Sequence, residues 1–448
     1  MGTAEHSYHS TTEAEKARKP PRGVAIIGGG VIGLSTAYFL ALSHREDARL
    51  TSSAPGNQRP QITIIESSDR LCPAASSQAT GSLGSSQRKE SKTGRAGLVC
   101  LSYRLQVRLA EQYNGKDEYG WSDQTIYRLQ KKGSSDSSSP GGGSGSKGPP
   151  VSVPLSDLPA WVRVRDDWDA YRVSSPPNAA HLDPRRFCEF LTKRVKELGV
   201  RIETSATATS IQLDPAGSAF SALHVRTSSG LSQSIPADSV VIAAGPWSDR
   251  VFATLFPSAQ VKLPMDSRGA AGNHARIRSP SGHGEDSVQV YFTNVTPDGS
   301  RFDVTSFPNG DLYIGGWGAV AEELPPLATQ VLPQPAEIEK MITATKHYVK
   351  VPKDKDLEYH DAGRCYRPTA VPNRPIITRV PFDLLFDRPS VDASVTADPG
   401  GLYINTGHSS DGVALSLGSG KLASELILGQ PLSVDISSLG LPGVASYL

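Results

Sequence analysis

Residues 24–33, Val-Ala-Ile-Ile-Gly-Gly-Gly-Val-Ile-Gly, decide the fold of this 448-residue chain. The apolar run Val24–Ile27, rich in β-branched residues, predicts a buried strand, and Val31–Leu42 predicts a helix. The glycines between them fit the pattern G-x-G-x-x-G in its required setting, directly after a strand and at the start of a helix. The stretch therefore predicts a strand, a tight turn and a helix whose start can receive a pyrophosphate.

Each glycine of the turn has a physical role. Gly28 permits the tight turn, Gly30 lets a pyrophosphate approach the backbone, and Gly33 lets the helix pack closely on the strand. The phosphates would face N–H groups at the positive end of the helix. A purely structural turn is one alternative. A membrane span is another, because residues 24–42 are uncharged, but the clustered glycines argue against a continuous span.

A carboxylate ends the next predicted strand, Ile62–Glu66. There Glu66 could accept hydrogen bonds from the ribose hydroxyls of an adenosine. It lies 33 residues beyond Gly33, more than the usual spacing of about 20. We interpret Ser43–Pro60 as an inserted loop that accounts for the excess, since surface insertions cost little closure entropy. The alternative is a solvated acid at a strand end. A carboxylate here also disfavours a 2′-phosphorylated nicotinamide cofactor.

The charge balance and the cysteines exclude several classes of partner. The chain has 46 Lys and Arg against 45 Asp and Glu, so neither nucleic acid nor an acidic membrane surface is indicated. Cys72, Cys100, Cys188 and Cys365 lie far apart, which gives no disulfide framework and argues against a zinc site. We predict no metal and a cytoplasmic location, with endosome-associated, peroxisomal and mitochondrial locations left open.

Two stretches have the composition of unstructured chain. Residues 1–22 lack the apolar run of a secretory signal and contain glutamates that mitochondrial presequences avoid, so we interpret them as a disordered leader. Residues 133–150, mainly Ser134–Pro150, are rich in Ser and Gly and cannot bury enough apolar surface to offset their ordering entropy. They predict a flexible surface insertion, with an interdomain linker as the alternative.

Further strand and helix signals continue to the end of the chain. Asp183 as N-cap and Pro184 at the first helical position begin a predicted helix that runs to about Leu198 and stops at Gly199. Predicted strands follow at 200–203, 240–245, 313–317 and 401–405, and a last helix at 419–428.

Five segments together resemble the D-amino-acid oxidase superfamily, which includes glycine and sarcosine oxidases and less characterised fungal members. They are residues 75–81 (ASSQATG), 181–187 (HLDPRRF), 241–248 (VIAAGPWS), 364–369 (RCYRPT) and 405–412 (NTGHSSDG), in the order the family has them. The resemblance implies FAD as the cofactor. The last segment departs from the family pattern, because Ser410-Asp411 stands where the family often has an aromatic or apolar residue.

The resemblance also implies which residues contact FAD. They come from the glycine turn, the end of the second strand, the small-residue loop, the adenine site, the turn after residue 243 and the last loop. These residues are Gly28, Gly29, Gly30, Val31, Ile32, Gly33, Glu66, Ser67, Ser76, Ser77, Gln78, Ala208, Ala244, Gly245, Trp247, Gly407, His408 and Gly412.

A substrate site is implied by the segment 364–369. Arg367 matches the family arginine that grips a substrate carboxylate, a task for which its planar fork is suited. Tyr366 is the other candidate catalytic residue, and Arg364 is the fallback for Arg367. Asn373 replaces a frequent acidic residue of the family. Cys365 lies one residue from the register of the cysteine that carries covalent flavin in sarcosine oxidases, so we predict noncovalent FAD.

These observations predict a mixed α/β protein. A discontinuous FAD-binding, Rossmann-like domain would pair with a substrate domain built on a mixed or antiparallel sheet. The predicted division assigns 23–100, 178–255 and 361–448 to the FAD domain and 101–177 and 256–360 to the substrate domain. The expected activity is oxidation of a small amine or amino acid with dioxygen. A flavin dehydrogenase and a flavoprotein that serves trafficking or scaffolding are the alternatives, and the oligomeric state stays open.

Overall fold

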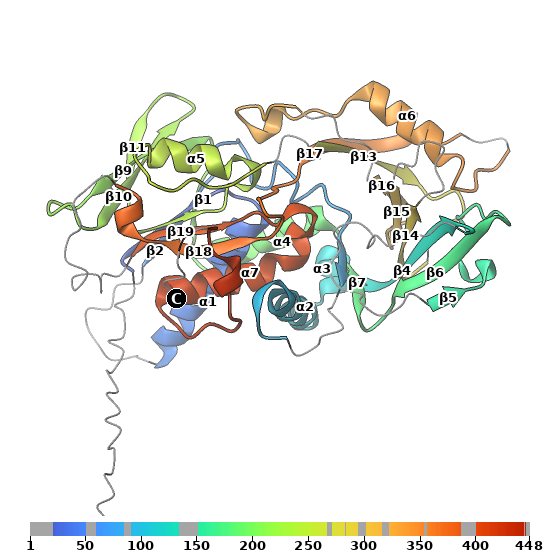
Figure 1. Ribbon diagram of the computed structural model, residues 1–448, viewed down its shortest axis with the longest axis horizontal. Coiled ribbons are helices and arrows are strands. Elements are labelled where there is room, and N and C mark those ends of the chain that lie inside the picture. The colour runs from blue at the N-terminus through green and yellow to red at the C-terminus, as the bar shows by residue number, and fades with distance from the viewer. Residues whose placement is uncertain are drawn as a thin grey trace, which may run out of the picture.

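Two large sheets organise the chain in the computed structural model (Figure 1). The structure describes residues 21–50, 60–84, 91–133, 151–266, 271–282, 284–293, 302–315, 322–353, 356–386, 400–442 and 444. Most of the predicted leader, the insertion 134–150 and residues 51–59 of the predicted loop lie outside the described residues.

The first sheet has six strands in the order β18-β19-β12-β1-β2-β8, and its neighbours run parallel except for β18 and β19. The strands are β1 (Gly23–Ile27), β2 (Gln61–Ile65), β8 (Arg201–Glu203), β12 (Ser239–Ile242), β18 (Ile376–Val380) and β19 (Gly401–Thr406). Because parallel strands end at the same edge, the turns after β1, β2 and β12 come together there.

Both faces of this sheet are covered, which explains why its central strands are almost wholly apolar. On one face, Val24 and Ile26 pack with helices; on the other, Ala25 and Ile27 pack with a three-stranded sheet. The helices are α1 (Val31–Leu50), α2 (Gly94–Tyr113), α3 (Gly115–Tyr119), α4 (Pro184–Glu197) and α7 (Gly412–Leu428). Helix α5 (Ser248–Leu255) lies on the other face, where Phe252 and Leu255 pack with the small sheet. The small sheet has β9 (Ala206–Leu213), β10 (Phe220–Thr227) and β11 (Ser232–Pro236).

The second sheet is mixed and has ten strands, of which eight follow the order β17-β13-β16-β15-β14-β4-β6-β5. Among the described strands of this sheet, only β14 and β4 pair in parallel. The strands are β3 (Ser82–Gly84), β4 (Ser122–Lys131), β5 (Val151–Val153), β6 (Trp168–Ser174), β7 (Ala179–His181), β13 (Ala271–Arg278), β14 (Ser287–Thr293), β15 (Phe302–Ser306), β16 (Asp311–Gly315) and β17 (Tyr359–Tyr366). Helix α6 (Pro335–Thr345) packs on one face of this sheet with Phe292 and Trp168.

The predicted fold class is confirmed, and the cap of α4 forms as expected. The Asp183 side chain accepts hydrogen bonds from the backbone N–H groups of Arg185 and Arg186, with Pro184 at the first helical position. Gly199, which follows the helix, has a φ of 85°. The strand–turn–helix opening is also present, so the uncharged stretch 24–42 does not form one continuous helix.

Two predicted helix boundaries are wrong. Helix α1 continues through Leu50, although the polar composition from Ser43 predicts a loop, because polar residues do not by themselves end a helix. Helix α7 begins at Gly412 instead of Ser419. Its first half is rich in glycine and serine, which form isolated helices poorly, but tertiary packing against α1 and α2 overrides that preference.

Two of the predicted domain boundaries fall inside elements of the structure. The boundary after residue 360 falls inside β17, which pairs with β13 in the second sheet. Helix α2 runs across the predicted boundary at residue 100. It packs on α7 through Leu98 and Leu101 and so belongs with the first sheet. The rest of the domain division stays a prediction.

Candidate functional site

A cavity of about 1090 Å³ lies where the carboxyl edge of the first sheet meets the second sheet. Ile27 and Ile65, at the ends of β1 and β2, line it from the first sheet. Residues of β14, β15 and β16 line it from the second sheet, and the loop before α7 lines it as well. The cavity is therefore built by segments from the whole length of the chain.

The glycine turn after β1 lies against this cavity. Gly28 has a φ of 112°, which other residues rarely adopt, and a Cβ atom there would lie 2.4 Å from the Ala243 carbonyl oxygen. A Cβ atom on Gly33 would lie 2.0 Å from the Gly28 oxygen, so only glycine lets α1 begin this close to the turn. At Gly30 the Cβ position is open except for Ser76 Oγ at 3.1 Å. The turn thus leaves space for a phosphate beside Gly30.

Glu66 follows β2, as predicted, and lines the cavity while only 8% of its surface is exposed. Its Oε2 accepts a hydrogen bond from the Gly29 N–H at 2.9 Å, and its Oε1 accepts one from the Ser68 N–H at 2.9 Å. The carboxylate therefore holds the glycine turn in place. Each carboxylate oxygen can accept more than one hydrogen bond, so ribose hydroxyls can still donate to it; that contact stays a prediction.

The loop after β2 directs its side chains to different places. Ser76 Oγ accepts a hydrogen bond from the Val31 N–H at 3.0 Å and lines the cavity. Ser77 Oγ instead donates to the Cys72 carbonyl oxygen at 2.8 Å, inside the loop. The Gln78 carbonyl oxygen accepts a hydrogen bond from the Tyr313 hydroxyl at 2.9 Å, which ties this loop to β16.

His408 is buried in the loop before α7. Its Nε2 lies 2.8 Å from Ser419 Oγ, and burial lowers its pKa to about 3, so the imidazole is neutral. The ring is held by α7, although the residue lines the cavity. This geometry fits the predicted role of cofactor contact better than a role in proton transfer.

Asp411 and Arg95 form an ion pair at the edge of the cavity. Asp411 directly precedes α7, and Arg95 is the second residue of α2. Burial raises the pKa of Asp411 to about 6, while the Arg95 guanidinium opposes the rise. The Arg95 guanidinium thus partly compensates the charge of Asp411, which stands where the family often has an aromatic or apolar residue.

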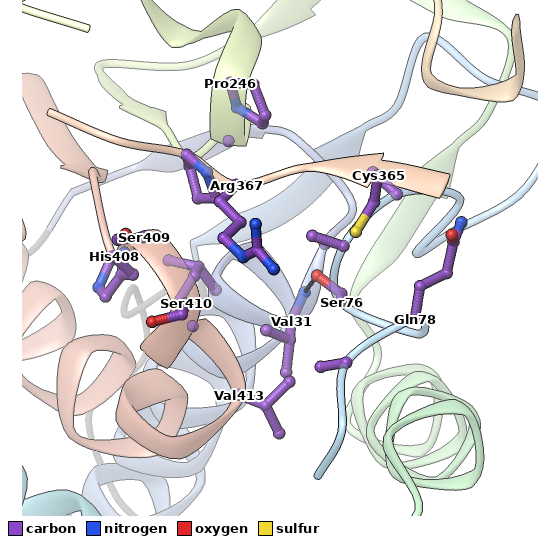
Figure 2. A pocket seen from close by; sticks show the side chains of 18 of the residues that line it. Val31, Ser76, Gln78, Pro246, Cys365, Arg367, His408, Ser409, Ser410 and Val413 are labelled. Atoms are coloured by element: carbon purple, nitrogen blue, oxygen red, sulfur yellow. Dashed lines mark hydrogen bonds between the residues drawn. The ribbon is translucent and has the colours of Figure 1, made fainter. Parts of the chain in front are cut away.

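The two arginines of the segment 364–369 have different environments. Arg364 lies 2.7 Å from a Glu322 carboxylate oxygen and is almost fully buried. Arg367 lines the cavity, and Figure 2 shows its guanidinium and the Cys365 thiol pointing into the same space. Tyr366 points elsewhere: it packs with Ala271 and Leu324, and its hydroxyl lies 3.4 Å from the Glu323 carbonyl oxygen. Of the two candidate catalytic residues, the structure therefore brings only Arg367 to the cavity.

Most predicted FAD contacts meet at the cavity. Those that line it are Gly28, Gly30, Val31, Ile32, Glu66, Ser67, Ser76, Gln78, Ala208, Ala244, Gly245, Trp247, His408 and Gly412. Gly29, Gly33, Ser77 and Gly407 are not among the lining residues; they shape the turns beneath it. Their contacts with a cofactor stay predictions.

Sequence patterns do not mark the residues that β14, β15 and β16 contribute to the cavity, namely Gln289, Tyr291, Asp303 and Tyr313. The segment SVQVYFT alternates polar and apolar residues, which is a strand signal. Alternation shows that one face of a strand is polar but not that this face lines a cavity instead of meeting water. Arg95 was missed for a similar reason, since nothing in its surroundings marks it.

The cavity has the features that an adenine dinucleotide requires. A carboxylate stands at the end of β2, an open glycine backbone stands at the start of α1, and the cavity continues to the start of α7. Within the described ranges, no three His, Cys, Asp or Glu side chains come together as a metal site. No helix in the described part of the chain is long and apolar enough to cross a membrane.

The parallel sheet, the glycine turn and the cavity define a dinucleotide-binding fold with a second sheet across the cavity. The family model of FAD-dependent oxidoreductases of the D-amino-acid oxidase type matches residues 23–426. The chain belongs to this family, and FAD is its cofactor.

Similar proteins are found among curated sequences and solved structures. A Schizosaccharomyces pombe protein with a provisional oxidoreductase assignment is 22% identical over 442 residues, covering 93% of this chain and 97% of its own. The structure resembles iminodiacetate oxidase from Chelativorans sp., with a TM-score of 0.62, 19% identity and coverage of 93% and 98% of the two chains. It also resembles glycine oxidase from Geobacillus kaustophilus, with a TM-score of 0.62, 18% identity and coverage of 95% and 99%.

Proposed function

We propose that the protein oxidises the C–N bond of a small amino acid, with dioxygen as the final electron acceptor. The observation that carries the proposal is Arg367, whose guanidinium enters the cavity and can hold a carboxylate in a bidentate pair. The structural relatives named above are, by their names, oxidases of glycine and iminodiacetate, which are both carboxylated amines. Their names support the same substrate class here.

The chain's own residues would bind, orient and shield the reactants. Glu66, the glycine turn and the loop before α7 would hold FAD, which when bound supplies the acceptor for a hydride from the substrate's α-carbon. Arg367 would fix the carboxylate and thereby the position of the α-carbon. Burial raises the pKa of Tyr291 and Tyr313, so both wall residues stay protonated and neutral. The imine product would then be hydrolysed by water.

Spectroscopy of the purified protein tests this proposal. We expect flavin absorbance bands, release of the flavin on acid precipitation, bleaching of the bands by carboxylated amines without oxygen, and oxygen uptake with the same compounds. Bleaching without oxygen uptake would point to a dehydrogenase. Flavin that no amine or amino acid bleaches would favour a role in trafficking or scaffolding. Flavin that stays with the precipitated chain would implicate Cys365 in a covalent bond.

A further inference from the structure

Asp303 is an acidic residue in the wall of the cavity to which the proposed reaction so far gives no role. It lies on β15, directly opposite Tyr291 of β14 and Gly315 of β16 in the strand pairing, and all three residues line the cavity. Gln289 Nε2 donates a hydrogen bond to its Oδ2 at 3.0 Å. Gln289 is buried and also lines the cavity. A carboxylate is thus held at a defined place in the substrate wall.

The charges around Asp303 come from several elements. Tyr291 and Tyr313 face it from the neighbouring strands, Cys365 and Arg367 lie at the end of β17, and Asp411 acts on Tyr291 from the start of α7. Burial raises the pKa of Asp303, and the Arg367 guanidinium is the charge that opposes this rise. Arg367 and Asp303 both line the cavity, and the charges of both act on Tyr313.

This arrangement matches the charges of an amino acid. The Arg367 guanidinium stabilises the negative charge of Asp303. A substrate carboxylate bound by Arg367 would neutralise this cation and remove that stabilisation. Burying an uncompensated carboxylate is costly, so the wall would then favour a positive group beside Asp303. A zwitterionic amino acid supplies the anion and the cation on the same carbon. Two wall residues of opposite charge would thus recognise both of its groups.

We propose that Asp303 binds the substrate's ammonium group and accepts its proton before oxidation; this inference rests on the proposed function. An N–H bond of the ammonium breaks, its electron pair stays on nitrogen, and an O–H bond forms on the Asp303 carboxylate. The amine is then neutral, and its nitrogen lone pair can assist loss of hydride from the α-carbon. The proton on Asp303 leaves to water with the product. General base catalysis of this kind contributes roughly a hundredfold or more.

The test is the pH profile of kcat/KM for the FAD-loaded enzyme with one amino acid. Asp303→Asn keeps the size of the side chain and an oxygen that can accept from Gln289. The variant can oxidise only amino acid whose amine is already neutral in solution, so its kcat/KM should fall about a hundredfold near neutral pH. It should then rise about tenfold per pH unit towards the ammonium pKa, because each unit gives tenfold more free amine. The kcat/KM of the wild type should change much less over this pH range.

Two further variants separate catalysis from structure. Asp303→Glu should recover part of the rate and the flatter profile, because it restores a carboxylate. Asp286→Asn, an exposed change just before β14, should leave the profile as in the wild type. A uniform loss in Asp303→Asn at every pH, with no change in slope, would overturn the inference.

A binding measurement needs no turnover and tests the same residue. Propanoate has the carboxylate of an amino acid but no ammonium, and its binding can be followed by the flavin absorbance. In the wild type its affinity should fall as Asp303 ionises, whereas in Asp303→Asn it should be tighter and no longer change with pH. Equal pH dependence in both proteins would overturn the inference. If no amino acid bleaches the flavin, the proposed function is wrong. The propanoate measurement would still show whether the ionisation of Asp303 affects a carboxylate bound beside it.

Discussion

Arg364 and Arg367 lie three residues apart, but their surroundings differ and so do their roles. The Arg364 guanidinium pairs with Glu322 and lies over the Tyr366 ring, at 5.7 Å from its centre. Arg364 therefore packs outside the cavity, against residues that do not line it. The Arg367 guanidinium lies beside the backbone of β13, where a Cβ atom on Gly272 would be 3.4 Å from its terminal nitrogens. The small residue at 272 leaves the Arg367 fork the room to enter the cavity.

Arg367→Ala should raise the KM for a carboxylated substrate by about ten- to a hundredfold, because a hydrogen bond to a charged group contributes about 1.5–3 kcal/mol. The flavin content should not change. Arg367→Lys should recover only part of the loss, because a point charge cannot reproduce the bidentate fork. Steady-state kinetics with an amino acid and its decarboxylated analogue measure this. Equal losses with both compounds would mean that Arg367 is structural.

Gly30→Val should abolish FAD retention, because the added side chain occupies the space beside the turn where the pyrophosphate is expected. The flavin-to-protein absorbance ratio measures the loss, and circular dichroism should show that most of the fold remains. The control is Gly284→Val, an exposed position whose added Cβ atom would meet its nearest neighbour at 3.9 Å. Full flavin occupancy in Gly30→Val would place the cofactor elsewhere.

At the scale of elements, α7 depends on its small residues. A Cβ atom on Gly420 would lie 2.5 Å from the Ser35 carbonyl carbon of α1, and one on Gly418 would lie 2.2 Å from Ser102 Oγ of α2. Larger side chains at these places would push α7 away from α1 and α2. Since the loop at Gly407–Gly412 leads directly into α7, the position of this helix also sets the position of the cavity wall.

Gly420→Ala should lower the free energy of unfolding by about 1–3 kcal/mol, the usual cost of overpacking. Helix propensity alone predicts the opposite sign, a gain of about 1 kcal/mol. The matched control is Gly440→Ala, where φ is −74° and the nearest atom to the added Cβ is 3.7 Å away. Urea unfolding of both variants decides between the two effects, and a stabilised Gly420→Ala protein would show that the packing of α1 on α7 is looser than described.

The start of α7 predicts a pH dependence of stability. The folded-state pKa of Asp411 is about 6, above its ordinary value of 3.8, so the folded chain holds this proton more tightly than the unfolded chain. The resulting stabilisation is present below a pH of about 4 and is lost as the pH rises through about 6. Asp411→Asn should therefore add up to about 3 kcal/mol to the free energy of unfolding near neutral pH, and little near pH 4. Urea unfolding of the FAD-free protein at both pH values measures this. An equal effect at both pH values would show that the raised pKa of Asp411 is not the cause.

At the scale of the whole molecule, a network of ion pairs joins the two sheets. Arg276 of β13 lies 3.3 Å from Asp183, the N-cap of α4, and 4.0 Å from Asp361 of β17. Arg185 of α4 lies 2.9 Å from the same Asp361. Helix α4 packs on the first sheet, whereas β13 and β17 belong to the second. The network therefore holds together the two walls between which the cavity lies.

Arg276→Ala should lower the free energy of unfolding by about 3–5 kcal/mol, because it leaves a buried carboxylate without its partner. Arg70→Ala removes an ion pair with Asp69 in which the two side chains are 64% and 72% exposed, and should cost no more than about 1 kcal/mol. Urea unfolding of the FAD-saturated proteins compares the two. Similar costs would show that the network contributes little to joining the sheets.

The sequence by itself determined the features that depend on neighbouring residues. The glycine turn, the carboxylate that ends β2 and the cap of α4 follow from backbone sterics and hydrogen bonds over a few positions, and all three are present. The order of the family-like segments also predicted FAD and the fold class, because each segment occupies a definite place in that fold.

Only the tertiary structure decided which of two nearby arginines enters the cavity, that Tyr366 does not, and that Asp303 does. It also set the start of α7 and placed β17 in the second sheet. The physical reason is that these outcomes depend on packing between segments far apart in the chain. A strand pattern shows which residues share a face, but the partner of that face, whether water, helix or cavity, is set by the segments that the fold brings against it.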